Sequence, residues 1–238
     1  QISLLRSCFL ESRCRSPGPR SSPGGFLQLK KEFEPRLQRV RLSELITFEL
    51  KGSSIRRDLR AGGRRTSRRA LGQLDKTLRL LEKCGCQIMG KIVTKTVGPV
   101  RSDDSVYPPA VRDIAESFES LCAASASNGL MILDSRTKHK NMGNVNGITS
   151  QRFRSGGDPF PHLVEAPLLG HSDLHVPLQL VDIVASGLVF PIACAVYCTS
   201  YGWNAHVRPE YPALREQFGA RLQQREYRYV DANGNRRG

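Results

Sequence analysis

The chain has 238 residues, enough for one large hydrophobic core or at most two small domains. Its 36 Lys and Arg residues against 22 Asp and Glu residues give a net charge of +14. This excess favours a polyanionic partner such as a nucleic acid over a basic surface without a specific ligand. The seven cysteines match no metal-binding pattern, and the size and composition argue against a disulfide framework, which indicates a reduced, cytoplasmic protein.

Residues 1–25 differ in composition from the rest of the chain. They are rich in Arg, Ser, Pro, Gly and Cys and lack periodicity, which predicts an irregular, disordered leader. Out-of-frame translation of a GC-rich gene or a damaged start gives a similar composition, so these interpretations stay open. The opening Gln1–Leu10 is too short and interrupted for a transmembrane span and lacks a signal-peptide cleavage site, so we expect no membrane association.

From Phe26 onward the patterns predict one ordered α/β domain over residues 26–238 that ends in a basic tail. The amphipathic segment Phe26–Leu37 predicts a helix, and Glu44–Gly52 predicts a short strand. Arg56–Arg69 contains seven arginines and two glycines, which predicts a flexible basic loop. Leucines at helical spacing then predict a helix over Ala70–Lys83.

The middle of the chain alternates between strand and helix patterns. Cys86–Val97 is rich in β-branched residues and predicts a strand. A helix is expected over Tyr107–Ser125, with its prolines in the first turn. The apolar Gly129–Ser135 predicts a short buried strand that ends at Asp134, and the Gly- and Asn-rich residues 135–161 predict a polar loop.

The last third of the chain continues this alternation. His162–Leu169 predicts a strand, and a helix is expected from Leu178. Another helix is expected over Pro212–Gln224, followed by a terminal strand at Tyr227–Val230 and a turn. Strands alternating with helices in this way indicate a mixed α/β fold.

Asp182 is the first candidate site residue, because it stands in a segment, His175–Phe190, that is otherwise almost entirely apolar. On a helix, Gln179, Asp182 and Ser186 share one face. A carboxylate there is costly to bury unless something offsets the cost. Either Asp182 caps a neighbouring loop by hydrogen bonds, or it points into a cleft and serves a cation or a general-acid role.

Asp134 is the second candidate, because active-site groups of α/β sheets commonly follow the carboxyl ends of strands. Either it forms an Asx turn that ends the strand, or it holds a metal ion beside phosphate-binding cations. The cations that follow it are Arg136, Lys138, His139 and Lys140.

Glu49 is the third candidate, although a simple exposed ion pair with Lys51 is the alternative. His171, Ser172 and Asp173 have the composition of a hydrolase triad, but neighbours in sequence rarely form one. The chain also lacks a GxSxG motif, a P-loop and a GxGxxG motif before a helix, which argues against a serine hydrolase and a Rossmann enzyme.

Three blocks together resemble the domain of unknown function 3800 family in order and spacing. They are "ELKGS" at Glu49–Ser53, "LMILDSR" at Leu130–Arg136 and "VEAPLLGHSDLHVPLQLVDIVAS" at Val164–Ser186. The resemblance covers roughly residues 26–198 and implies a ribonuclease-H-like mixed sheet flanked by helices, a fold shared with nucleases and transposases.

The resemblance also implies roles for residues. Asp134 and Asp182 match acids that would hold Mg²⁺ or Mn²⁺, and Glu49 matches a third catalytic acid. Gln179, Ser172 and His175 would support them. The family normally begins with a strand that carries an Asp-Glu-Ser-Gly-like motif, whereas the nearest match here is "FLES" at residues 9–12.

Three functions are therefore expected in turn. The first is a divalent-metal-dependent nuclease that acts on phosphodiester bonds. The second is a catalytically inactive nucleic-acid-binding module that lacks the first-strand acid, and the third is a basic protein whose partner is another protein. In the first two, the cations that contact phosphates are Arg56, Arg57, Arg64, Arg65, Arg68, Lys138 and Lys140.

Overall fold

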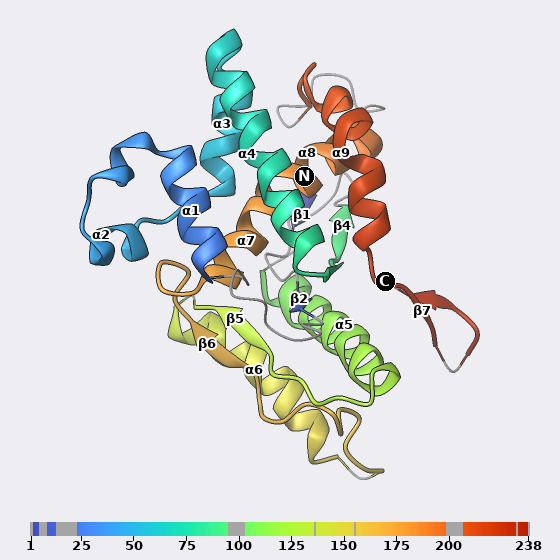
Figure 1. The fold of residues 1–238 in the computed structure, drawn as a ribbon. Helices are drawn as coiled ribbons and strands as arrows, with labels where there is room; N and C mark the ends of the chain where they lie inside the picture. Colours follow the sequence, from blue (N-terminus) through green and yellow to red (C-terminus); the bar gives the residue numbers. More distant parts are fainter. Residues whose placement is uncertain are drawn as a thin grey trace.

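The computed structural model shows a mixed α/β protein that is mostly helical and has small two-stranded sheets, as the alternating patterns predicted (Figure 1). The residues that it describes are 2–4, 9–12, 23–94, 103–135, 137–154, 156–198, 207–231 and 233–237.

Two short antiparallel sheets contain the described parts of the N-terminal leader. β1 (Ile2–Leu4) pairs with β4 (Ile92–Thr94), and β2 (Phe9–Ser12) pairs with β3 (Cys86–Met89). The "FLES" segment is therefore a strand, and these seven leader residues are not irregular as we expected. The strand predicted over residues 86–97 is divided into β3 and β4 at Gly90 and Lys91.

The strand predicted over Glu44–Gly52 is wrong. After α1 (Pro23–Phe33) and a 3-10 turn at Pro35–Gln38, residues Leu42–Thr47 form α2, and Gly52 begins the next helix. The buried Lys30 explains part of this difference, because its Nζ donates to the carbonyl oxygens of Leu45 and Ile46 at 3.2 and 2.8 Å. A long-range side chain thereby binds carbonyls near the end of α2 that strand pairing would otherwise use.

The flexible loop predicted over Arg56–Arg69 is also wrong, because α3 (Gly52–Arg60) and α4 (Arg64–Lys83) occupy almost all of it. Only a short turn separates the two helices, and Gly62 adopts a positive φ of 70° there. Arginine is a good helix former. The apolar residues between the arginines lie on a buried face: Ile55, Leu59, Ala70, Leu74, Leu78 and Leu81.

A parallel βαβ unit follows the long helix α5 (Asp103–Ala124). β5 (Ile132–Asp134) and β6 (Leu168–Gly170) pair in parallel, and α6 (Lys138–Arg152) lies between them in the chain. The predicted strand end at Asp134 is confirmed. The polar loop expected over residues 135–161 is wrong for its first half, because α6 packs Asn141, Asn144 and Ile148 inward.

The apolar segment after β6 forms one long interrupted helix. α7 (Val176–Val184) continues through a π-helical turn at Ala185–Val189 into α8 (Phe190–Tyr197). Among the described residues this is the one helix long and apolar enough to cross a bilayer, but 67% of its most apolar window is buried inside the protein. It therefore packs as a core helix. The predicted last helix is confirmed as α9 (Tyr211–Arg225).

The buried apolar side chains form two clusters. The larger one gathers side chains of α1, α3, α4, α7, α8 and α9, and the smaller one gathers those of α5, α6 and β5. β3 joins them, because Ile88 belongs to the first cluster and Met89 to the second. Figure 1 shows the helices of the larger cluster above the β5–β6 pair and α6. The turn at residues 171–175, between β6 and α7, passes from one cluster to the other.

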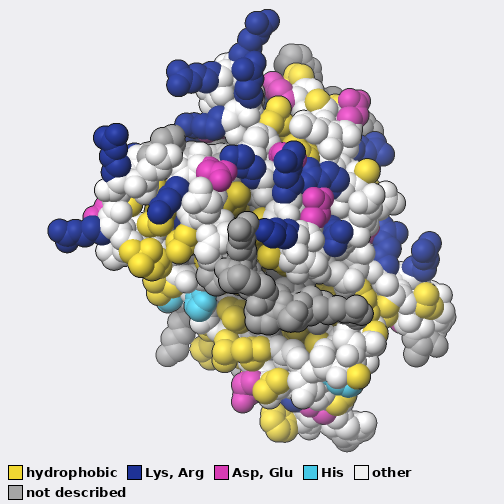
Figure 2. Space-filling model, in the orientation of Figure 1, with side chains coloured by type: hydrophobic (Ala, Val, Ile, Leu, Met, Phe, Trp, Pro, Cys, Tyr) yellow, Lys and Arg dark blue, Asp and Glu magenta, His cyan; other side chains and the backbone are white. Residues whose placement is uncertain are grey.

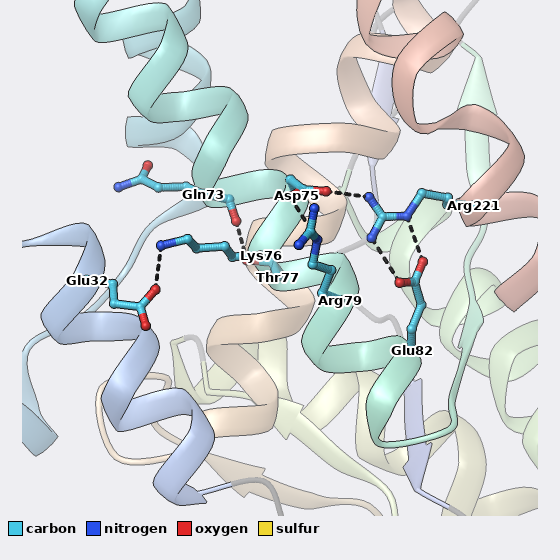
Figure 3. A network of polar contacts seen from close by, with 8 residues as sticks. All are labelled: Glu32, Gln73, Asp75, Lys76, Thr77, Arg79, Glu82 and Arg221. Carbon is cyan, nitrogen blue, oxygen red and sulfur yellow. Dashed lines mark hydrogen bonds and ion pairs between the residues drawn. The ribbon is translucent and has the colours of Figure 1, made fainter.

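Arg221 fastens α9 to α4 (Figure 3). Its guanidinium donates to both carboxylate oxygens of Glu82, at 2.7 and 2.9 Å, and to Asp75 at 2.7 Å. This bidentate geometry lowers the pKa of Glu82 and raises that of Arg221. On the other side of α4, Lys76 binds Glu32 of α1.

We expect Arg221→Ala to lower the free energy of unfolding by about 1–2 kcal/mol at pH 7, because two carboxylates lose a partly exposed shared partner. Since the folded-state pKa of Glu82 is depressed, this contribution is present above the ordinary pKa of 4.5 and is lost as the pH falls through the lower folded-state pKa. Urea unfolding of both proteins from pH 7 to pH 3 measures the difference. The control is Arg79→Ala, whose exposed ion pair to Asp75 lies within α4 and is expected to contribute about 0.3–0.5 kcal/mol. Equal losses in the two variants would contradict a bidentate clamp.

Candidate nucleic-acid interface and the Asp182 network

Asp182 binds the N-terminus of α3. Its Oδ2 accepts a hydrogen bond from the backbone N–H of Gly52 at 2.8 Å, and its Oδ1 accepts one from the Ser186 hydroxyl at 2.8 Å. Gly52 is the first residue of α3, whose first turn has no acidic residue and whose N-cap makes no side-chain hydrogen bond. A carboxylate is stabilised there by the helix dipole. The capping interpretation of Asp182 is therefore confirmed.

Gln179 extends this network to the segment before α3. Its side chain is 1% exposed, and its Oε1 accepts from the backbone N–H of Leu50 at 3.2 Å. Its Nε2 donates to the backbone carbonyls of Ser172 and Asp173, at 2.7 and 3.2 Å. One buried amide thus joins residue 50, the turn before α7, and α7 itself.

Glu49 closes the network from the other direction. It accepts a hydrogen bond from the Ser172 hydroxyl at 2.6 Å and forms an ion pair with Lys51 at 2.9 Å. The ion pair considered from the sequence is confirmed. Glu49, Ser172, Gln179 and Asp182, all chosen from the sequence, are therefore brought into one polar network, but their printed partners lie largely within that network.

Asp134 lies at the carboxyl end of the β5–β6 pair, opposite Gly170 in the register. The next residue, Ser135, donates its backbone N–H to the Gly170 carbonyl at 2.8 Å. The exposed His175 stands at the N-cap of α7, and its ring lies against Gly170: a Cβ there would meet the His175 ring at 2.8 Å. Asp134 thus stands at the strand end from which the Ser172 turn departs.

The structure does not complete the metal site that the resemblance implies. Within the described ranges, no three His, Cys, Asp or Glu side chains gather closely enough to hold a metal ion. Both oxygens of Asp182 are also engaged in hydrogen bonds. The residues therefore do not fit a bound Mg²⁺ or Mn²⁺ as the structure places them, and that cofactor remains a prediction.

Three arginines of the Arg56–Arg69 segment serve internal contacts. The Arg56 guanidinium stacks over the Phe190 ring at 4.5 Å, and its Nη1 lies 3.5 Å from the Ser186 carbonyl oxygen. Burial lowers the pKa of Arg56. Arg60 donates to the Tyr211 hydroxyl, and Arg69 pairs with Asp58 at 2.7 Å. Arg56, which we expected to contact phosphates, therefore packs against α8.

The remaining arginines of this segment form an exposed basic surface. Figure 2 shows Lys and Arg side chains projecting from the end of the molecule where α3 and α4 meet, at the top of the view. Four arginines there are exposed and form no ion pair with any residue in the described part of the chain. We call them the arginine surface: Arg57, Arg64, Arg65 and Arg68. The side chains of Lys138 and Lys140 lie outside the described residues.

Sequence reasoning missed the role of Gly52 and the burial of Lys30. A Cβ at Gly52 would lie 2.2 Å from the backbone oxygen of Asp182, so α3 approaches α7 as closely as glycine allows. Lys30, at 1% exposure, binds the end of α2, and burial lowers its pKa against the opposing effect of Glu49. The signal available for Gly52 was its position in "ELKGS", directly before two serines.

Comparison with known proteins gave no relative: no family model, no curated protein and no solved structure matches the chain. The resemblance to the domain of unknown function 3800 family therefore remains a prediction from the three sequence blocks.

Proposed function

We propose that the protein binds nucleic acid through the arginine surface of α3 and α4. The observation that carries this proposal is the group of exposed arginines without ion pairs, Arg57, Arg64, Arg65 and Arg68, on two adjoining helices of a chain with a net charge of +14. Guanidinium groups bind phosphates in a bidentate manner, and each neutralised phosphate releases counterions.

The surface is supported on a rigid base, which favours a binding role over a mobile basic tail. Arg69 of α4 pairs with Asp58 of α3 at 2.7 Å, so the two helices are fastened beside the surface. Asp182 and Ser186 hold the other end of α3. Arginines on fixed helices lose less conformational freedom on binding than those of a flexible loop.

The proposal is tested with the full chain and a fluorescent DNA duplex of about 20 base pairs, with an RNA duplex of equal length beside it. We expect the fluorescence anisotropy to rise to saturation at about 50 mM salt, because the binding is electrostatic. A chain that leaves both duplexes unbound at that salt concentration contradicts the proposal and favours a protein partner.

A second candidate is a divalent-metal-dependent nuclease of ribonuclease-H-like fold. The observation that favours it is the β5–α6–β6–α7 order: Asp134 and Gly170 end neighbouring parallel strands, and the turn after Gly170 binds Glu49 through Ser172. Strand ends of this kind hold the active sites of open α/β sheets. Asp134 and Asp182 would be the acidic ligands, as the resemblance implies.

Asp134→Asn and Asp182→Asn separate the two candidates. If the protein is a nuclease, cleavage of DNA or RNA with Mg²⁺ or Mn²⁺ is lost in Asp134→Asn while its unfolding midpoint is unchanged. Asp182→Asn is expected to lose about 1 kcal/mol of stability in addition, because it removes the charge from the N-terminus of α3. A gel assay and urea unfolding measure the two effects. Binding without cleavage in the wild type supports the module, and cleavage that survives Asp134→Asn excludes this site.

A reduced, cytoplasmic location is likewise proposed. Cys84, Cys86, Cys122, Cys194 and Cys198, the cysteines of the described part of the chain beyond the leader, are free thiols, and all but the first are buried. Burial raises the pKa of Cys194 to about 12, so this thiol is unreactive. These cysteines pack as small apolar residues, which a reducing compartment preserves.

A further inference from the structure

A polar cavity lies far along the chain from the arginine surface. It has a volume of about 260 Å³. Its walls come from the turn between β3 and β4, from the middle of α5, and from the C-terminal hairpin of β7 (Tyr229–Val230) and β8 (Arg236–Arg237). Figure 1 shows this hairpin extending beyond the end of α9. The volume is near the lower limit of about 300 Å³ for small-molecule sites, which suits a ligand the size of one nucleotide.

Cations from all three segments line the cavity, and their ion pairs are exposed. Lys91 pairs with Asp113 at 2.6 Å, with side chains 44% and 38% exposed. Arg112 lies 3.9 Å from Glu116, at the limit of an ion pair. Such exposed pairs contribute little, so a phosphate can compete for the cations. The freed carboxylates could then accept hydrogen bonds from the amino groups of a base.

Tyr229 adds an aromatic ring to this polar lining. Tyr227 stacks beside it, with ring centroids 6.0 Å apart and planes inclined by 21°. Tyr227 is itself fixed, because its backbone N–H donates to Ile88 at 2.9 Å and its hydroxyl lies 3.1 Å from that of Ser120. At the tip of the hairpin, Asp231 accepts backbone N–H groups of Asn233 and Asn235, both at 2.9 Å. The ring is therefore held in place at the cavity wall.

We infer that this cavity binds one unpaired nucleotide of a single-stranded nucleic acid, with its base stacked on Tyr229 and its phosphate on Lys91, Arg112 or Arg237. The inference rests on the proposed nucleic-acid-binding function and adds the class of substrate. Aromatic rings beside cations are the recurring means of binding single strands, because every base has a face for stacking. A paired base cannot reach such a ring, so duplex binding does not use it.

The test measures the affinity of the full chain for a fluorescent oligo-dA of about 10 nucleotides and for the DNA duplex. We expect Tyr229→Leu to weaken binding of the single strand about tenfold and to leave duplex binding unchanged. Tyr229→Phe keeps the ring and is expected to bind both probes like the wild type. Phe153→Leu is the control, because Phe153 is an aromatic residue at 84% exposure that follows α6.

A second variant covers the case in which Tyr229→Leu disturbs the hairpin. Arg112→Gln alters an exposed, loosely paired side chain of α5 and is expected to weaken single-strand binding threefold or more, again without effect on the duplex. Duplex binding with unchanged single-strand affinity in both variants overturns the cavity inference alone. Absence of binding to either probe overturns the proposed function together with it.

Discussion

Gly52→Ala is expected to lower the free energy of unfolding by about 3 kcal/mol, the largest stability effect of any single methyl group we propose to add. The new Cβ would lie 2.2 Å from the backbone oxygen of Asp182 and 2.9 Å from the Ile183 Cα. Both are backbone atoms, so no side chain can move aside. α3 would have to shift from α7 and loosen the bond between Gly52 and Asp182, 2.8 Å in the wild type.

Gly72→Ala is the matched control for this prediction. Gly72 lies within α4, and a Cβ there would have no atom within 4 Å. Alanine is the better helix former, so this variant is expected to gain about 0.5–1 kcal/mol. Urea unfolding of the wild type and the two variants gives the sign and size of each change. A Gly52→Ala protein as stable as the wild type would show that α3 and α7 are not in this close contact.

Replacing all four arginines of the arginine surface, Arg57, Arg64, Arg65 and Arg68, by glutamine is expected to weaken duplex binding about 100-fold at low salt. Each lost phosphate contact removes counterion release that every nucleic-acid sequence would share, so the loss does not depend on the duplex sequence. The side chains are exposed and form no ion pair in the described part of the chain, so stability changes little. Anisotropy titrations give the affinities.

A second fourfold variant removes the same charge from other places. Arg39, Arg41, Lys83 and Arg154 are exposed, and Lys83 stands at the opposite end of α4 from Arg64. Their replacement by glutamine lowers the net charge of +14 by the same four units. We expect at most a threefold loss of affinity, because these side chains lie away from the arginine surface. Equal losses in the two variants would mean that net charge alone governs the binding.

The sequence predicted those elements whose pattern is self-contained. The leucines of α4, the apolar run of α7 and α8, and α9 each form a stripe or run that a helix buries without help from distant residues. The segment Glu44–Gly52 has no such pattern. Its backbone is held by Gln179 and Asp182, which lie 129 and 130 positions further along the chain from Leu50 and Gly52. A local pattern cannot contain that information.

The candidate site shows the same division. The sequence identified Gln179, Asp182 and Ser186 as one helix face, and the structure places all three against α3 or the segment before it. It also suggested a capping role for Asp182 as one alternative. The choice between that role and a metal-binding one depends on where Gly52 lies. The arginines were identified, but only helical folding separates the inward Arg56 from the exposed Arg57.

The most direct test of nucleic-acid binding by the arginine surface is the salt dependence of duplex affinity. The slope of log K against log salt counts the phosphates that a protein neutralises, at about 0.9 per contact. We predict that the slope of the wild type falls by about 3–4 in the fourfold variant of Arg57, Arg64, Arg65 and Arg68, and by less than about 1 in the control. Equal slopes in the wild type and in the arginine-surface variant would contradict the account.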